Sequence, residues 1–200
     1  MELTVSIEEI NYGDVAVKVL PLLSNTGSHR SNAAAKMLAA IAQLPDQLIC
    51  SVFDAIPTRQ KHEIFAEFAA ENRGRIIAAI NHFSESRRLG VAASDFSMNQ
   101  VPEFRITISA IDYPCIAERF LPIIRQKLLN TVGGVLVLRA VIEHASAAQI
   151  CGLLDRFVGD KDAFLASLVN QNQQRVISLI EDAAQKQNIH LKIRSVSLQT

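Results

Sequence analysis

The chain lacks the features that mark several large classes of protein. Its three cysteines are an odd number with no close pair, which argues against a disulfide framework and favours a reducing compartment. Twenty lysines and arginines balance twenty aspartates and glutamates, so the formal net charge is zero, whereas proteins that hold nucleic acid by its phosphates usually carry a basic excess. The apolar run 132–138 stops at Arg139, well short of the roughly 18 residues that cross a membrane.

The first residues and the overall composition point the same way. The N-terminal segment is acidic and alternates in polarity, which is unlike a secretory signal. We therefore expect a cytoplasmic protein without membrane contact and without nucleic acid as a partner. Apolar residues make up 49% of the chain and charged residues only 20%, so part of the apolar surface is expected to lie in a homo-oligomer interface.

Motifs that would define an enzyme or a metal site are missing as well. The sequence contains no G-x-S-x-G, no Walker lysine loop and no Rossmann glycine pattern. The run from His62 opens like a zincin motif, but Ala66 stands where the second histidine is required. Glu143, His144 and Cys151 lie close together in the sequence but follow no metal-ligand spacing. We therefore expect no catalytic constellation, no metal and no cofactor.

The strongest positive feature is that the chain repeats itself. Residues 2–7 (ELTVSI) correspond to residues 103–108 (EFRITI), and the correspondence continues at a constant offset of 101 residues as far as Asp54 and Asp155. One residue then drops out of the second copy, and the offset becomes 100. A fixed self-offset over most of a chain is the signature of a duplicated structural unit.

The repeat divides the chain into a first copy, residues 1–99, and a second copy, residues 103–200, which together form a fused pseudo-dimer in one globule. Each copy reads as a strand, five helical segments and a closing strand, the last at about 88–97 and 189–198. A two-stranded sheet is marginal alone, so the strands of both copies should join one sheet of about four strands with helices on one apolar face. The predicted fold class is therefore α+β, mostly helical, with pseudo-two-fold symmetry.

Local signals place several boundaries. Asn11 and Asp112 are good N-caps for the first helix of each copy, and the prolines ten residues later, Pro122 among them, should kink or end it. Residues 135–138 (VLVL) resemble a strand, but their counterpart in the first copy is alanine-rich, so we expect a helix in both. Thr58 and Asp160 are expected to cap the next long helices.

Other pairs of equivalent residues have structural explanations. Asn72 and Asn172 suit N-caps of a fresh helix. Tyr12 and Tyr113 can cover the edge of the core with the hydroxyl in water. The apolar phase of the last strand flips before Val196, which indicates a bulge.

The best local candidate for a binding site is the polar loop 24–32, which runs into a predicted helix. Free backbone N–H groups at a helix N-terminus bind anions, and Ser28, His29 and Arg30 would add side-chain contacts. An ordinary N-cap in a flexible loop explains the same residues, so both interpretations stay open.

Three further groups of residues carry both a structural and a functional interpretation. Cys50 and Cys151 fit small buried packing residues better than reactive thiols, and Glu63, Glu67 and Glu71 fit a solvated helix face better than a cation site. The polar face of the sheet is mildly basic but has no alternating aromatic residue, so a dimer contact or a solvated face is favoured over RNA stacking. Its expected members are Thr4, Ser6, Arg105, Thr107, His190, Lys192 and Arg194.

These patterns predict a non-enzymatic binding or assembly module, with itself or another protein as partner. The alternative is a small-molecule binding protein or enzyme that holds an anionic metabolite between the two halves, where pockets often form. A deep polar pocket between the halves would favour the alternative, and a flat apolar patch would favour assembly.

Overall fold

The computed structural model describes residues 1–24, 40–41, 43–99, 102–132 and 136–200. These residues form an α+β fold in which helices predominate, as the sequence predicted. The described elements, in chain order, are β1 (Glu2–Ile10), α1 (Tyr12–Ser24), α3 (Asp46–Ala55), α4 (Thr58–Glu71), α5 (Arg73–Arg87), β2 (Val91–Asn99), β3 (Glu103–Ile111), α6 (Tyr113–Val132), α7 (Leu136–His144), α8 (Ala147–Phe157), α9 (Lys161–Gln171), α10 (Gln173–Gln185) and β4 (Leu191–Gln199).

The four strands form one antiparallel sheet with the order β2-β3-β1-β4, so strands of both halves do join a single sheet. The opening strands β1 and β3 pair at the centre, and the closing strands β2 and β4 lie at the edges. Helices α5 and α10 each lead into an edge strand. The core therefore has the β-α-β-β-α-β arrangement called ferredoxin-like, with further helices inserted after β1 and after β3. This arrangement by itself assigns no function.

The register of the strands follows the same offsets as the sequence. Thr4 pairs with Arg105, the residue 101 positions later, so the β1–β3 pair is centred between two equivalent residues. Thr4 also pairs with Ser197 on β4, and Arg105 with Ser97 on β2. Both edge pairs shift register at equivalent places, and the shift on β4 is the bulge predicted before Val196. A two-fold rotation about the middle of the sheet would thus exchange the strand partners of the two halves.

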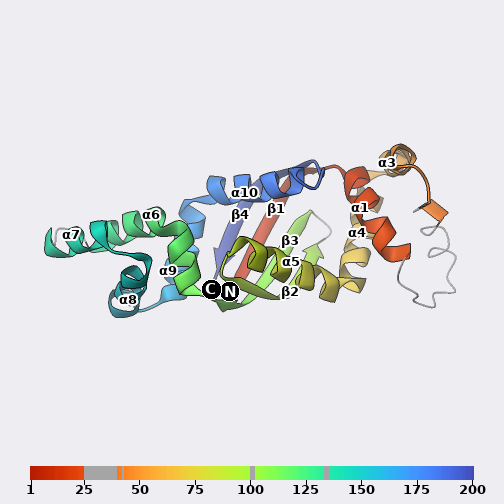
Figure 1. Ribbon diagram of the computed structural model, residues 1–200. Helices are drawn as coiled ribbons and strands as arrows, with labels where there is room; N and C mark the ends of the chain where they lie inside the picture. Colours follow the sequence, from red (N-terminus) through yellow and green to blue (C-terminus); the bar gives the residue numbers. More distant parts are fainter. Residues whose placement is uncertain (25–39, 42, 100–101, 133–135) are drawn as a thin grey trace.

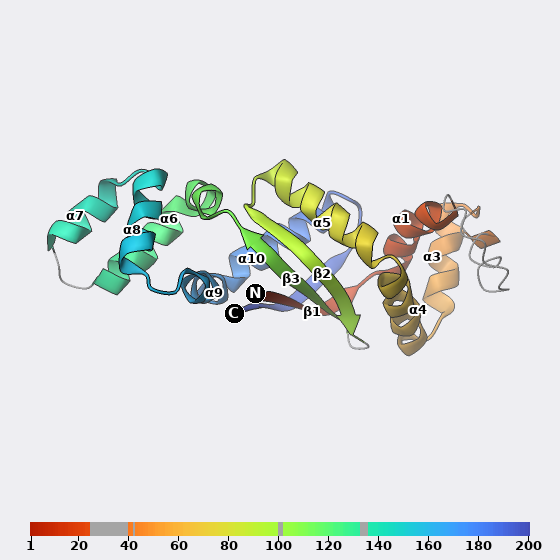
Figure 2. The same cartoon turned by 90° about the horizontal axis from the view of Figure 1, so that it is seen from below.

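The molecule is elongated, with the sheet in the middle (Figure 1). Helices α6 to α9 form a lobe at one end, and α1, α3 and α4 form a lobe at the other (Figures 1 and 2). Helix α10 packs Ile177 against the buried Val5 and Val196 of the sheet. The largest core cluster lies in the α6–α9 lobe and includes Leu128 and Ile150.

The two faces of the sheet differ as the alternating pattern predicted. Val5 and Ile7 are buried, whereas Thr4 and Ser6 remain partly exposed. Arg105 is exposed on the polar face, where its Nε lies 2.9 Å from the Glu103 carboxylate.

Side chains of the helices cover parts of the sheet edges. The Asn81 amide of α5 accepts a hydrogen bond from the Ala93 N–H at 2.7 Å and donates to the Ala93 carbonyl at 3.0 Å. On the opposite edge, Asn170 makes the same two bonds with Leu198, at 2.9 and 3.0 Å. Glu181, the equivalent of Asn81, accepts from a β4 amide at 2.7 Å. An uncovered edge strand is a template for pairing with another chain, so these contacts disfavour association by extension of the sheet.

Most of the predicted helix signals are confirmed. Asn11 and Asp112 accept hydrogen bonds from backbone amides three residues later, at 3.2 and 3.1 Å. The kink before Pro122 occurs at Phe120, whose φ of −115° and ψ of 22° are not helical. Residues 136–138 are helical in α7, as the comparison of the copies predicted.

Two capping predictions are corrected, and one holds. Thr58 is the first residue of α4, and Pro57 occupies the N-cap position without a side-chain hydrogen bond. Asp160 caps α9 as expected, accepting from a backbone amide at 2.8 Å. Asn72 and Asn172 do separate two helices, but their amides donate to carbonyls four residues earlier, at 3.0 and 2.8 Å. They therefore close the preceding helix and leave the next one without a side-chain cap.

Candidate functional site

Two clefts lie where the halves meet. At the first, the Asn11 N–H donates to the His190 carbonyl at 2.9 Å, which ties the end of the second half to the first helix of the first half. At the second, the Asp112 N–H donates to the Gly90 carbonyl at 2.8 Å, which makes the equivalent connection with the halves exchanged. The cleft beside Asn11 measures about 770 Å³ and the cleft beside Asp112 about 440 Å³.

The larger cleft is rich in carboxylates, and we call it the carboxylate cleft. Its lining comes from both halves and consists of Glu9, Ile10, Asn11, Tyr12, Asp54, Lys61, Glu181, Asp182, Gln185, Ile189, His190, Leu191 and Lys192. Four carboxylates stand against two lysines. A concave surface of this charge attracts cations and repels anions.

Asp14 and His190 form a linked pair beside this cleft. Asp14 lies in the first turn of α1, and its Oδ2 accepts the His190 backbone N–H at 3.0 Å and lies 2.6 Å from His190 Nδ1. The Asp14 side chain is 16% exposed and the imidazole 83% exposed. A carboxylate on one ring nitrogen orients a histidine to exchange a proton or a hydrogen bond through the other. The sequence had placed His190 on the polar face of the sheet, whereas it precedes β4 and binds α1.

Tyr12 lines the same cleft, but its hydroxyl is buried. The ring lies between His62 and Phe65, at centroid distances of 5.3 and 4.8 Å. Among the described residues the hydroxyl has no hydrogen-bond partner, contrary to the expectation that it reaches water. Burial raises the pKa of the Tyr12 phenol to about 12. The equivalent Tyr113 does have a partner, because its hydroxyl donates to Asp162, the counterpart of His62.

This difference predicts opposite effects of one substitution at the two equivalent positions. Tyr12→Phe removes a buried hydroxyl without a described partner and should raise the free energy of unfolding by about 1 kcal/mol, whereas Tyr113→Phe removes a hydrogen bond and should lower it by about 1 kcal/mol. Because the Tyr12 pKa in the folded state lies above the ordinary value of 10.0, the wild type should lose stability as pH rises from 10 towards 12, since only the unfolded chain then ionises there.

Urea unfolding of both variants at neutral and alkaline pH checks these expectations. Tyr12→Phe should lose less stability than the wild type over the alkaline range. A loss of stability in Tyr12→Phe at neutral pH would mean that its hydroxyl has a partner in the folded protein.

The smaller cleft is rich in arginine, and we call it the arginine cleft. It is lined by Ser86, Arg87, Arg88, Cys115, Glu118 and Arg119. Helix α5 ends there at Arg87, and its C-cap residue Arg88 is left-handed with φ 50° and ψ 53°. The Arg88 carbonyl accepts a hydrogen bond from Cys115 Sγ at 3.2 Å, so the end of α5 is held against the first turn of α6.

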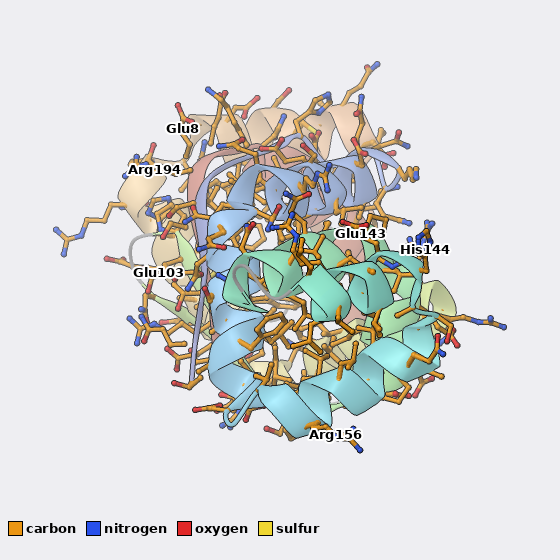
Figure 3. The ribbon with its side chains drawn as sticks, turned by 90° about the vertical axis from the view of Figure 1, so that its left-hand side faces the viewer. Glu8, Glu103, Glu143, His144, Arg156 and Arg194 are labelled. Carbon is orange, nitrogen blue, oxygen red and sulfur yellow. The ribbon has the colours of Figure 1, made fainter. Side chains whose placement is uncertain are left out.

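The residues predicted to bind an anion, Ser28, His29 and Arg30, lie outside the described residues, and that site stays a prediction. Glu143 and His144 are exposed and point away from the helical lobe (Figure 3). No group of three or more His, Cys, Asp or Glu side chains within the described ranges is arranged to hold a metal ion.

The cysteines and the glutamate face agree with their packing and solvation interpretations. Cys50 and Cys151 are half-buried, and burial is the main cause that raises the pKa of each thiol. A thiol held protonated is a poor nucleophile. Glu63, Glu67 and Glu71 are all exposed.

The sequence suggested a pocket between the halves as an alternative but did not predict where either cleft lies or which residues line it, although one signal for them was available. Residues 83–96 and 183–196 are among the stretches where the two copies stop matching. Arg87, Arg88 and His190 all fall in these stretches. Where the two copies share a backbone but differ in residue type, the backbone does not require either residue, and the difference can be a sign of function.

No family model, curated protein or solved structure matches this chain. None of the described helices is long and apolar enough to cross a membrane. The geometry of the clefts is therefore the main guide to function.

Proposed function

We propose that the protein binds small-molecule ligands in the clefts that its two halves form together, which is the alternative that the sequence left open. The observation that carries this proposal is the carboxylate cleft, which takes its lining from both halves and measures about 770 Å³. Small-molecule sites usually measure about 300–1,000 Å³ and combine an apolar body with a few convergent polar groups. Tyr12, Ile189 and Leu191 supply apolar surface, and His190 and the carboxylates supply polar contacts.

The proposed duplication explains why the clefts come as a pair. If each unit docks its closing loop on the first helix of the other unit, two equivalent junctions result. The equivalent register of the strands in the two halves supports an origin by duplication. The offsets pair Gly90 with His190 and Cys115 with Asp14, so equivalent positions of the two junctions carry different chemistry. We infer that the two clefts diverged to hold different ligands.

A blocking substitution tests the carboxylate cleft. Gln185→Trp places a large side chain in the lining, and Gln187→Trp makes the same change two residues later, outside the lining. In native mass spectrometry of untagged protein before dialysis, we expect a reproducible adduct of small-molecule mass on the wild type and on Gln187→Trp, and none on Gln185→Trp. An adduct that persists on Gln185→Trp, or a wild type without one, would contradict the proposal for this cleft.

A second candidate function, self-association, is favoured by apolar side chains at the two ends of the molecule. Leu136 and Val137 of α7 are 80% and 75% exposed, and Leu48 of α3 is 51% exposed. Helices α7 and α3 lie at opposite ends of the elongated molecule (Figures 1 and 2). We propose a second copy of this chain as the occupant, because one apolar end of a copy can cover the opposite end of the next, and burying apolar surface stabilises by about 25 cal/mol per Å².

Charge introduced at the apolar end tests this candidate. Leu136→Lys combined with Val137→Lys should abolish concentration-dependent association in sedimentation velocity. Glu143→Lys, also exposed on α7, is the control and should associate like the wild type. A wild type that stays monomeric at all concentrations would contradict self-association while leaving the cleft proposal intact.

A further inference from the structure

The arginine cleft brings three guanidinium groups to one junction from two elements. Arg87 belongs to the last turn of α5, Arg88 is its C-cap, and Arg119 lies in the second turn of α6. All three line the same cleft of about 440 Å³. Their convergence depends on the close docking of the loop at Gly90, which reaches the start of α6 through the hydrogen bond to Asp112.

These arginines are not neutralised by described neighbours. None of them forms an ion pair with a carboxylate of a described residue, and Arg87 lies instead over the Phe83 ring, 5.8 Å from its centroid. The single carboxylate in the lining is Glu118, which leaves an excess of two positive charges. A phosphate monoester carries about 1.5 to 2 negative charges at neutral pH, so its charge balances that excess.

Comparison of the copies indicates that the framework does not require arginine here. The residue equivalent to Arg88 is Asn188, which has the same left-handed conformation, with φ 55° against 50°. Asparagine adopts this conformation more readily than arginine. The residue equivalent to Arg87 is Gln187, which is neutral. The second half therefore builds the same turn with uncharged residues at these two positions and carries its one positive charge at Lys186, the counterpart of Ser86, so the paired charges of Arg87 and Arg88 need another explanation.

We propose that the arginine cleft binds a small anion bearing a phosphate group. The guanidinium group presents planar, forked N–H donors that match phosphate oxygens, and it remains charged at all physiological pH values. The Ser86 hydroxyl also lines the cleft, but it donates to the Phe83 carbonyl at 2.9 Å, so it would have to turn away from that carbonyl to donate to the ligand. This inference rests on the proposed binding function and deepens it, because it names the ligand class of the smaller cleft.

The ordinary explanation of Arg87 alone is that a cation stabilises the C-terminal end of a helix dipole. Arg156 provides the matched control, because it also lies in the last turn of its helix, α8, and is exposed outside both clefts (Figure 3). If only the dipole matters, Arg87 and Arg156 are alike. If the cleft binds phosphate, only the arginines of the cleft affect affinity.

The test measures inorganic pyrophosphate binding by titration calorimetry at constant ionic strength. The variant Arg87→Gln with Arg88→Asn carries the residues of the second half, so we expect it to fold with stability equal to the wild type and to bind at least about tenfold more weakly. Glu118→Gln should bind more tightly, since it removes the opposing charge, and Arg156→Gln should bind like the wild type. Equal affinity in the double variant and the wild type would overturn the inference.

A local readout identifies the cleft as the place of binding. Cys115 lines the arginine cleft, whereas Cys151 lies on α8 outside both clefts. Pyrophosphate should slow alkylation of Cys115 by iodoacetamide and leave alkylation of Cys151 unchanged. A wild type that shows no saturable pyrophosphate binding in the millimolar range would overturn the phosphate inference. The mass-spectrometry test of the carboxylate cleft would still decide the proposed binding function independently.

Discussion

Replacing Leu128 by alanine is expected to lower the free energy of unfolding by about 3 to 4 kcal/mol. Leu128 is 1% exposed and packs in the largest core cluster with Ile124, Ile142 and Ile150. Truncation removes the transfer energy of the deleted methyl groups and leaves a cavity that rigid neighbours cannot fill. The change should appear in urea unfolding as a shift of the midpoint with little change in slope.

The same substitution at Leu136 provides the control. Leu136 lies in the same lobe but is 80% exposed, so its replacement by alanine should change the free energy of unfolding by no more than about 0.5 kcal/mol. Equal losses from Leu128→Ala and Leu136→Ala would mean that burial in the folded chain does not distinguish these sites.

Gly90→Ala is expected to cost about 2 to 4 kcal/mol, from two causes that act together. Gly90 has a φ of 69°, a left-handed conformation that a residue with a side chain adopts at a cost. A Cβ built on Gly90 would also lie 2.8 Å from the Asp112 carbonyl oxygen and 3.0 Å from Cys115 Cβ. Relief of these contacts requires the loop to move away from α6, so Gly90→Ala should also weaken pyrophosphate binding in the arginine cleft.

Gly74 is the matched position for this second prediction. It lies in the first turn of α5, and a Cβ there would meet no atom within 4 Å. Alanine has a higher helix propensity than glycine. Gly74→Ala should therefore leave the free energy of unfolding unchanged or raise it by about 0.5 to 1 kcal/mol. A loss at Gly74 as large as at Gly90 would show that neither the left-handed conformation nor the close approach is the cause.

Much of the framework could be predicted because it depends on short-range patterns. Alternation located the strands, Asn11 and Asp112 marked helix starts, and the phase change before Val196 marked the bulge. Comparison of the copies corrected local propensity at residues 136–138, which a single window would assign to a strand. Each of these signals depends either on residues a few positions apart or on comparison with the equivalent residues of the other copy.

The location and the lining of the clefts could not be predicted because they depend on contacts between distant residues. Asp14 and His190 are 176 positions apart, and nothing local to either indicates the other. The sequence correctly placed Asn72 and Asn172 between two helices, but it did not show which helix each side chain would cap. An amide at such a position can hydrogen-bond to the helix before it or to the helix after it. His190 was placed on the sheet because it continues an alternating pattern, but its hydrogen bonds to α1 hold it ahead of β4.

The position of the chain ends has a consequence for how this fold can be encoded. The termini lie side by side (Figure 1), with Glu2 paired to Gln199, and Glu103 is paired to Asn99 in the same way at the connection between the halves. A circularly permuted chain that began at Glu103 and continued through a short linker into residues 1–99 would therefore keep every strand pair. The order of the two halves in the gene decides which half is synthesised first and can affect the folding route. The strand pairs of the folded sheet do not depend on that order.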